Sequence, residues 1–155
     1  MYNTKTTKIM KEKVLEAFAE LGFELTPMED FFGFDYENMH LLYMPASDDE
    51  NFLNISVPGI YDIGECNQRL FVELTNKINA TLKYVKAYGL GGSLWIFYER
   101  ELFGDEDLPA LISRIVLHLE AALVFSRMTI VEMEKEELSG DIVESIELDD
   151  NNDND

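Results

Sequence analysis

The order of the patterned segments constrains the fold of this chain more than any other feature of its sequence. Apolar residues recur at helical spacing over 10–21, 65–82 and 107–136, and three strand-like runs separate the first helix from the second. Two further strand-like runs, 84–88 and 94–98, precede the last helix. The links between strands are short and polar, as in antiparallel connections. The sequence therefore predicts an α+β fold of order α-β-β-β-α-β-β-α, with helices packed on an antiparallel meander sheet in two layers.

Glycine and proline mark where the strands should end. The third run alternates over 53–57 and is expected to end at Pro58-Gly59. Gly89-Leu90-Gly91-Gly92 lies between the last two strands, where glycines supply positive φ for a hairpin. A phosphate-binding loop would instead place its glycines before a helix N-terminus, so this segment does not predict a nucleotide site.

The chain has the size and composition of one domain with an acidic end. It has 155 residues, of which 46% are hydrophobic, and a net charge of −19. From Glu132 onwards there are eleven acidic residues and one base, Lys135. We expect a single domain over 1–136 and an acidic, largely disordered tail over 137–155, because its last residues are only Asp and Asn.

The negative charge limits the classes of partner. It repels phosphate backbones, so nucleic acid is not expected, and it favours either solubility or a basic partner. The apolar stretch Leu108–Val131 is interrupted by four ionisable residues, Arg114, His118, Glu120 and Arg127. These would be costly in lipid, so no membrane span is expected and the cytoplasm is the expected location.

No group of residues in the sequence predicts catalysis, a metal site or a cofactor. His40 and His118 are far apart and have no companion ligands at zinc-site spacing. Cys66 is the single cysteine, so an internal disulfide is excluded, and no base lies near it in sequence. We therefore expect a protein without catalytic, metal-ligating or cofactor-binding residues.

The last helix has two apolar stripes, although a helix on a sheet needs only one. The first stripe is expected to face the sheet and consists of Leu108, Leu111, Ile112, Ile115, Leu119, Ala122, Leu123 and Ile130. The second lies well off it and consists of Leu117, Ala121, Val124, Met128 and Val131. This second stripe must meet the first helix of the same domain, a second subunit or a bound chain.

The last strand raises the same question for the sheet. Trp95 and Phe97 point to the face opposite Leu94, Ile96 and Tyr98. Both faces are thus partly apolar, so either helices cover both or one aromatic face binds another protein. The candidate partner surface consists of Leu117, Ala121, Val124, Met128, Trp95 and Phe97.

The pattern of segments from Lys5 to about Val131 resembles the type III secretion chaperone-like fold. It also resembles a related bacterial family of candidate sensory-transduction regulators. Three stretches carry the likeness: Leu74-Thr75-Asn76-Lys77-Ile78-Asn79, Ser93-Leu94-Trp95-Ile96-Phe97-Tyr98-Glu99 and Asp107-Leu108-Pro109. The resemblance implies homodimers that bind other polypeptides and have no active site. The acidic tail departs from the compact pattern of these families.

The sequence thus favours a non-enzymatic protein-binding module, chaperone-like or regulatory, that forms a homodimer. Its partner would be another polypeptide, basic if the charge takes part in binding. A small-molecule-binding regulator, or an enzyme of unrecognised type, is the alternative. A deep closed pocket lined by carboxylates would favour that alternative.

Overall fold

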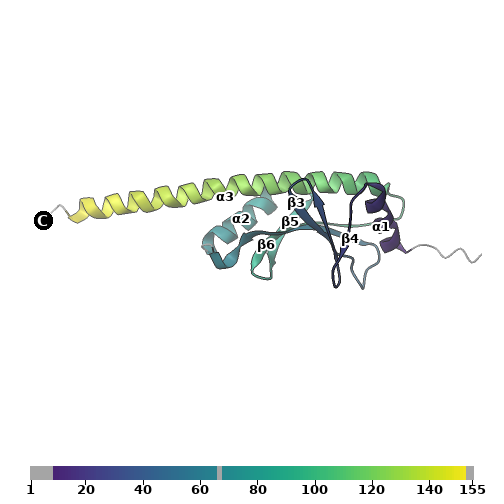
Figure 1. Ribbon diagram of the computed structural model, residues 1–155. Coiled ribbons are helices and arrows are strands. Elements are labelled where there is room, and N and C mark those ends of the chain that lie inside the picture. Colours follow the sequence, from purple (N-terminus) through teal and green to yellow (C-terminus); the bar gives the residue numbers. More distant parts are fainter. Residues whose placement is uncertain (1–8, 66–67, 153–155) are drawn as a thin grey trace, which may run out of the picture.

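The computed structural model describes residues 9–65 and 68–152, with side chains described for 9–64 and 68–140. Three α-helices and six β-strands form this part of the chain (Figure 1). The helices are α1 (Met10–Glu20), α2 (Gln68–Thr81), which follows a short 3-10 turn at Ile63–Glu65, and α3 (Leu108–Asn152). The strands are β1 (Thr26–Pro27), β2 (Phe32–Tyr36), β3 (Met39–Tyr43), β4 (Phe52–Asp62), β5 (Val85–Leu90) and β6 (Ser93–Glu101). Cys66 lies outside the described residues.

The strands form one antiparallel sheet in the order β1-β2-β3-β4-β6-β5. The first four strands are a meander, then β6 pairs with β4 and β5 forms the far edge. Gly91 and Gly92 make the two-residue turn between β5 and β6, with φ of +58° and +85°. A two-residue hairpin turn of this kind needs positive φ at both positions, which is why glycine occupies both. The α+β fold with an antiparallel sheet and helices packed on it is confirmed.

All three helices pack on one face of the sheet. Phe18 of α1 and Ile115 of α3 are fully buried in one cluster with Ile96 of β6. Leu74 of α2 packs in a second cluster on Ala87 of β5. The strand residues of these two clusters alternate along the sequence, as do Leu53, Ile55 and Val57 of β4, because successive side chains of a strand point to opposite faces. The helical layer therefore covers one face of the sheet only.

Two details of the sheet differ from the sequence prediction. Thr26–Pro27 pairs with β2 as a short edge strand, which is absent from the predicted order of elements. β4 also does not end before Pro58 but continues to Asp62, with a register shift between Val57 and Tyr61. A bulge tolerates proline because the extra residue needs no ladder hydrogen bond, so the strand passes through a residue that normally ends one.

α3 begins where the sequence predicts and ends later. The Asp107 carboxylate accepts a hydrogen bond from the backbone N of Ala110 at 3.2 Å, and Pro109 lies in the first turn, where proline needs no hydrogen-bond partner. The helix then continues to Asn152, into the segment that we expected to be largely disordered. Glu and Leu are strong helix formers, so this segment can remain helical without burying a face. Figure 1 shows its yellow end running past α2.

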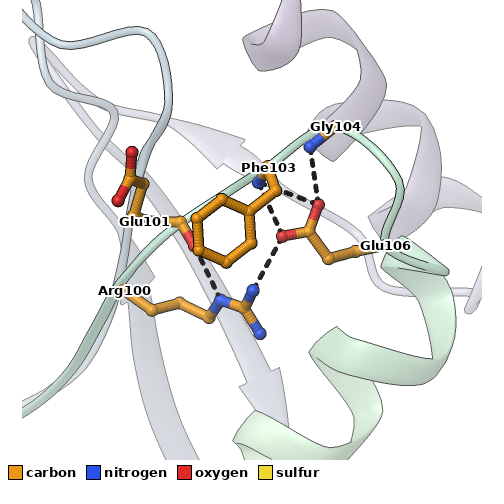
Figure 2. Close-up of polar contacts among 5 residues, drawn as sticks. All are labelled: Arg100, Glu101, Phe103, Gly104 and Glu106. Carbon is orange, nitrogen blue, oxygen red and sulfur yellow. Dashed lines mark hydrogen bonds and ion pairs between the residues drawn. The ribbon is translucent and has the colours of Figure 1, made fainter.

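A compact set of polar contacts fixes the connection from β6 to α3 (Figure 2). The Glu106 carboxylate accepts hydrogen bonds from the backbone N of Phe103 and of Gly104, both at 2.8 Å, and pairs with Arg100 at 2.7 Å. Arg100 Nε also donates to the carbonyl of Glu101. Burial opposes ionisation of Glu106, but these hydrogen bonds and the Arg100 charge outweigh it and lower its pKa. The loop thus holds the start of α3 in one orientation.

Candidate functional site

The second apolar stripe of α3 remains uncovered in the folded chain. The exposed fractions are 53% for Leu117, 51% for Val124, 60% for Met128 and 49% for Val131, and Ala121 is exposed too. α1 does pack against α3, but through residues of the buried cluster such as Phe18. Contact with the first helix of the same domain therefore does not explain this stripe. We call these five residues the seam.

Because the seam is apolar as well as the sheet-facing stripe, α3 is apolar enough to resemble a membrane-spanning helix. By length and composition, Leu108–Gly140 could cross a membrane, since it contains an 18-residue stretch with a mean hydropathy of 1.7, of which 33% is buried. The core helix of a domain passes the same test, and Ile112 and Leu119 are fully buried on the sheet. Arg114 and Arg127 are exposed on the side of α3 that faces away from the sheet. That no membrane is bound stays a prediction.

A shallow apolar depression of about 330 Å³ adjoins the seam at Ala121. His118 forms one wall, between the rings of Tyr84 and Tyr98 at centroid distances of 5.1 and 6.1 Å. Tyr84 lies just before the first residue of β5, Val85. Its φ of +70° turns it out of the strand, so its ring lies against α3 and is largely exposed.

The sheet face opposite the helices carries an aromatic stack. Phe97 lies between Tyr88, at a centroid distance of 4.1 Å, and Trp95, at 5.8 Å, with all three rings nearly parallel. Phe97 is fully buried, so it supports this surface but offers no area to a partner, contrary to its place in the candidate set. Trp95 is half-buried and Tyr88 is exposed. Burial, followed by the Glu99 charge, raises the pKa of Tyr88.

The same open face holds two buried polar atoms without a hydrogen-bond partner among the described residues. They are Asn54 Oδ1 and Ser56 Oγ, on neighbouring outward positions of β4. The Asn54 amide donates to Glu99 at 3.2 Å, and Glu99 forms an ion pair with Lys86. Buried polar atoms are nearly always paired in folded proteins, so these two atoms are exceptions, and they lie beneath the surface of this face. Sequence reasoning missed them because Asn and Ser in a strand are ordinarily solvent-facing.

The outer edge of the sheet is closed by a side chain. The Asn79 amide of α2 donates to the carbonyl of Ala87 at 2.9 Å and accepts from its backbone N at 2.6 Å. Asn79 therefore satisfies the outward-facing pair at the middle of β5, where another strand would have to bind. Addition of a foreign strand at this edge is blocked there.

A second depression, of about 640 Å³, lies beside the N-terminus of α1 and is open to solvent. Four carboxylates line it, Glu29, Asp30, Asp49 and Glu50, together with Lys11 and apolar residues. Phe32 and Tyr43 stack along it at a centroid distance of 6.0 Å, and burial raises the pKa of Tyr43 to about 12. The Glu50 carboxylate accepts a hydrogen bond from the backbone N of Met10, so it caps α1. The depression is thus lined by carboxylates, but it is open rather than closed.

The two histidines lie in different surroundings. His40 Nδ1 is 2.8 Å from Asp35 Oδ1 on the exposed surface of the sheet, whereas His118 lies between two tyrosine rings. Within residues 9–64 and 68–140, no three His, Cys, Asp or Glu side chains come close enough together to hold a metal ion. The structure thus does not bring either histidine to a cluster of ligands.

The chain matches no protein-family model and no curated protein sequence. Its fold is similar to that of YbjN from E. coli, described as a candidate transcription regulator, with a TM-score of 0.55 and 13% sequence identity. That match covers 82% of this chain and 93% of YbjN. An uncharacterized protein from Methanothermobacter thermautotrophicus is also similar, with a TM-score of 0.50, 17% identity and coverage of 83% and 98%.

At these identities the likeness concerns the fold. The similarity to YbjN supports the regulator-like side of the resemblance found in the sequence. Neither structure is described as a secretion chaperone, so that side of the resemblance stays a prediction.

Proposed function

We propose that this chain is a non-enzymatic, protein-binding regulatory module that forms a homodimer through the seam of α3. The observation that carries the proposal is the exposure of Leu117, Val124 and Met128 in a row along one helix. Contiguous apolar patches of this kind mark interaction surfaces on folded proteins. The likeness of fold to a candidate transcription regulator supports a regulatory role, and a chaperone-like role is the related alternative.

Self-association of the seam is tested by sedimentation equilibrium of the wild type and of Val124→Glu. The wild type should sediment at twice the 17.8 kDa mass of the chain, and Val124→Glu should be a monomer, because it places a carboxylate in the middle of the contact. Val72→Glu is the matched control, since Val72 is an equally exposed valine on α2. A wild type that is monomeric at all concentrations would refute the dimer.

We assign the open sheet face to the second polypeptide, which we take to be basic. Tyr88 and Trp95 supply apolar area there. The net charge of −19 attracts a basic chain over a long range. The same negative charge repels phosphate backbones, so the proposed partner is not a nucleic acid, and we take the protein to be cytoplasmic.

Trp95 is the single tryptophan of the chain and reports directly on this face. A peptide of alternating lysine and valine should change its fluorescence, and the effect should weaken with salt. An alternating glutamate and valine peptide is the control for charge. Tyr88→Ala should weaken binding of the basic peptide, and Val124→Glu should leave it unchanged. No fluorescence change with either peptide, at concentrations up to the millimolar range, would remove this face as the binding surface.

A small-molecule-binding regulator is the second candidate, and the depression beside α1 favours it. Stacked Phe32 and Tyr43 with four carboxylates around them suit an organic cation, and Lys11 already lies over the Phe32 ring at 5.6 Å. Spermidine should then raise the melting temperature of the wild type more than that of Phe32→Leu. Equal shifts in the two proteins would leave only unspecific screening of the negative charge.

A further inference from the structure

The exposed positions along α3 follow a heptad spacing. Leu117, Ala121, Val124, Met128 and Val131 are separated by four, three, four and three residues. Arg114 continues the same spacing at one end, and Lys135 and Leu138 continue it at the other, and all three are exposed as well. A repeat of about 3.5 residues is the pattern by which one helix packs along another over several turns. The seam is therefore shaped for a long helix rather than for a compact surface.

We infer that the seam binds a second copy of itself in antiparallel orientation, with the two-fold axis passing between Ala122 and Leu123. This deepens the dimer proposed above and rests on it. A heptad has two core positions, a and d. In an antiparallel pair, a residue at position a of one helix packs against a residue at position d of the partner helix. The small Ala121 then faces Val124 of the partner copy, and Leu117 faces Met128 of the partner copy. Large and small side chains thus interdigitate.

Charged residues beside the seam select this register. Glu120 and Arg127 each come one position before a seam residue, so both lie on the same side of the seam. With Ala121 opposite Val124, Glu120 of each copy lies beside Arg127 of the other, so the two-fold axis produces two ion pairs. Sliding one helix by one heptad toward its C-terminus would instead place Arg127 beside Arg127 and Glu120 beside Glu134. Flanking charges of this kind set partner orientation in paired helices.

The distribution of charge along the whole helix excludes the parallel arrangement. From Glu132 to the end of the sequence, eleven acidic residues stand against one base. A parallel pair would place these two segments side by side, and would also set Arg114 against Arg114 and Lys135 against Lys135. The antiparallel pair sends the acidic segments to opposite ends. In this register Leu108–Glu137 of one copy overlaps the same stretch of the other, and seven of the eleven acidic residues lie beyond the overlap.

The surroundings of the seam leave room for the partner helix. Ala121, the smallest residue of the seam, lines the shallow depression between Tyr84 and His118. Val124 of the partner copy would lie over this hollow, with the exposed Tyr84 ring at its side. The open sheet faces of the two copies would then point away from each other, so each remains free for its own polypeptide.

Disulfide trapping in the full chain, with Cys66 replaced by serine, tests the orientation. Leu117→Cys and Met128→Cys proteins are oxidised separately and as a mixture. In the antiparallel register the mixture should cross-link between the two variants, because positions 117 and 128 face each other. Pairs of the same position would be about 16 Å apart along the axis, at 1.5 Å per residue, which is beyond disulfide reach. Predominant cross-linking within each single variant would overturn the antiparallel arrangement.

A charge exchange gives a second measurement that does not depend on cysteine chemistry. Glu120→Arg and Arg127→Glu should each raise the dissociation constant of the dimer roughly tenfold, and the double variant should restore it. In a parallel pair Arg127 would meet Glu132, so Glu120→Arg would have no effect and the double variant would not recover. Either of these results overturns the orientation while the dimer stands. A wild type that sediments as a monomer overturns the dimer and the orientation together.

Discussion

The two faces of α3 have nearly the same side chains and opposite surroundings. Ile112, Ile115 and Leu119 are fully buried on the sheet, whereas Leu117 and Val124 are about half exposed on the other side of the same helix. Both stripes are regular enough to be found in the sequence, since each repeats at helical spacing. The comparison teaches that apolar periodicity predicts a face that needs cover, but not what covers it. The cover is decided by how the helix is rotated on its own sheet.

The largest effect should come from shortening a side chain on the covered face. Leu119→Ala should lower the free energy of unfolding by roughly 2–5 kcal/mol, because it removes buried methyl groups and leaves a cavity in the cluster around Ile115. Urea unfolding followed by circular dichroism measures the loss. The loss should be the same at low and high protein concentration, since the cluster lies within one chain. A loss below about 1 kcal/mol would show that α3 is not docked on the sheet as described.

The edge of the sheet at β5 is a third surface to compare with the two faces of α3, because a single side chain, Asn79, covers it. Asn79→Ala should cost roughly 1–3 kcal/mol, since it leaves the buried backbone N and carbonyl of Ala87 without their partner. Hydrogen exchange should also become faster at Ala87. Asn76→Ala, three residues earlier on the exposed side of α2, is the matched control and should have little effect. Unchanged exchange at Ala87 would contradict the protective role of Asn79.

The sequence predicted the three helices, five of the six strands, the hairpin at Gly91-Gly92 and both stripes of α3, because each depends on local spacing. It missed contacts between distant segments. Glu50 caps α1 across forty residues, and Asn79 pairs with Ala87 of a strand that follows it in the chain. No periodic pattern encodes such contacts, since each uses one polar side chain that could equally face solvent.

The candidate surface shows the same division between local and distant information. Leu117, Val124 and Met128 lie together and exposed, as their spacing predicts. Phe97 is buried because the ring of Tyr88 stacks on it from the neighbouring strand, and that register could not be derived from either strand alone. The burial of a strand residue depends on which residues of the neighbouring strands lie beside it. The exposure of a helical residue depends on the side of the helix on which it lies, and this follows from its spacing along the sequence.

Glu106 holds the loop that leads into α3, on which the contrast between the two faces depends. Loss of its charge should therefore weaken the attachment of α3 to the sheet. Glu106→Gln should lower the free energy of unfolding at pH 7 by roughly 1 kcal/mol, because hydrogen bonds to a charged acceptor are lost. The lowered pKa of Glu106 means that its charge stabilises the fold above about pH 4.5, and that this contribution disappears as pH falls through the folded pKa. The difference between variant and wild type should therefore shrink in acid. A difference that grows in acid would contradict the assignment.

The smallest effect should come from the same leucine-to-alanine change on the uncovered face. In the monomeric Val124→Glu background, Leu117→Ala should change the free energy of unfolding by less than about 0.5 kcal/mol, since Leu117 is 53% exposed and packs on little of its own chain. In the wild-type background the same change should weaken the dimer, so the melting temperature should fall more at high protein concentration than the monomer value implies. Equal effects in the two backgrounds would mean that Leu117 contributes nothing to self-association. An effect as large as that of Leu119→Ala would mean that both faces of α3 are covered within one chain, and the contrast between them would be lost.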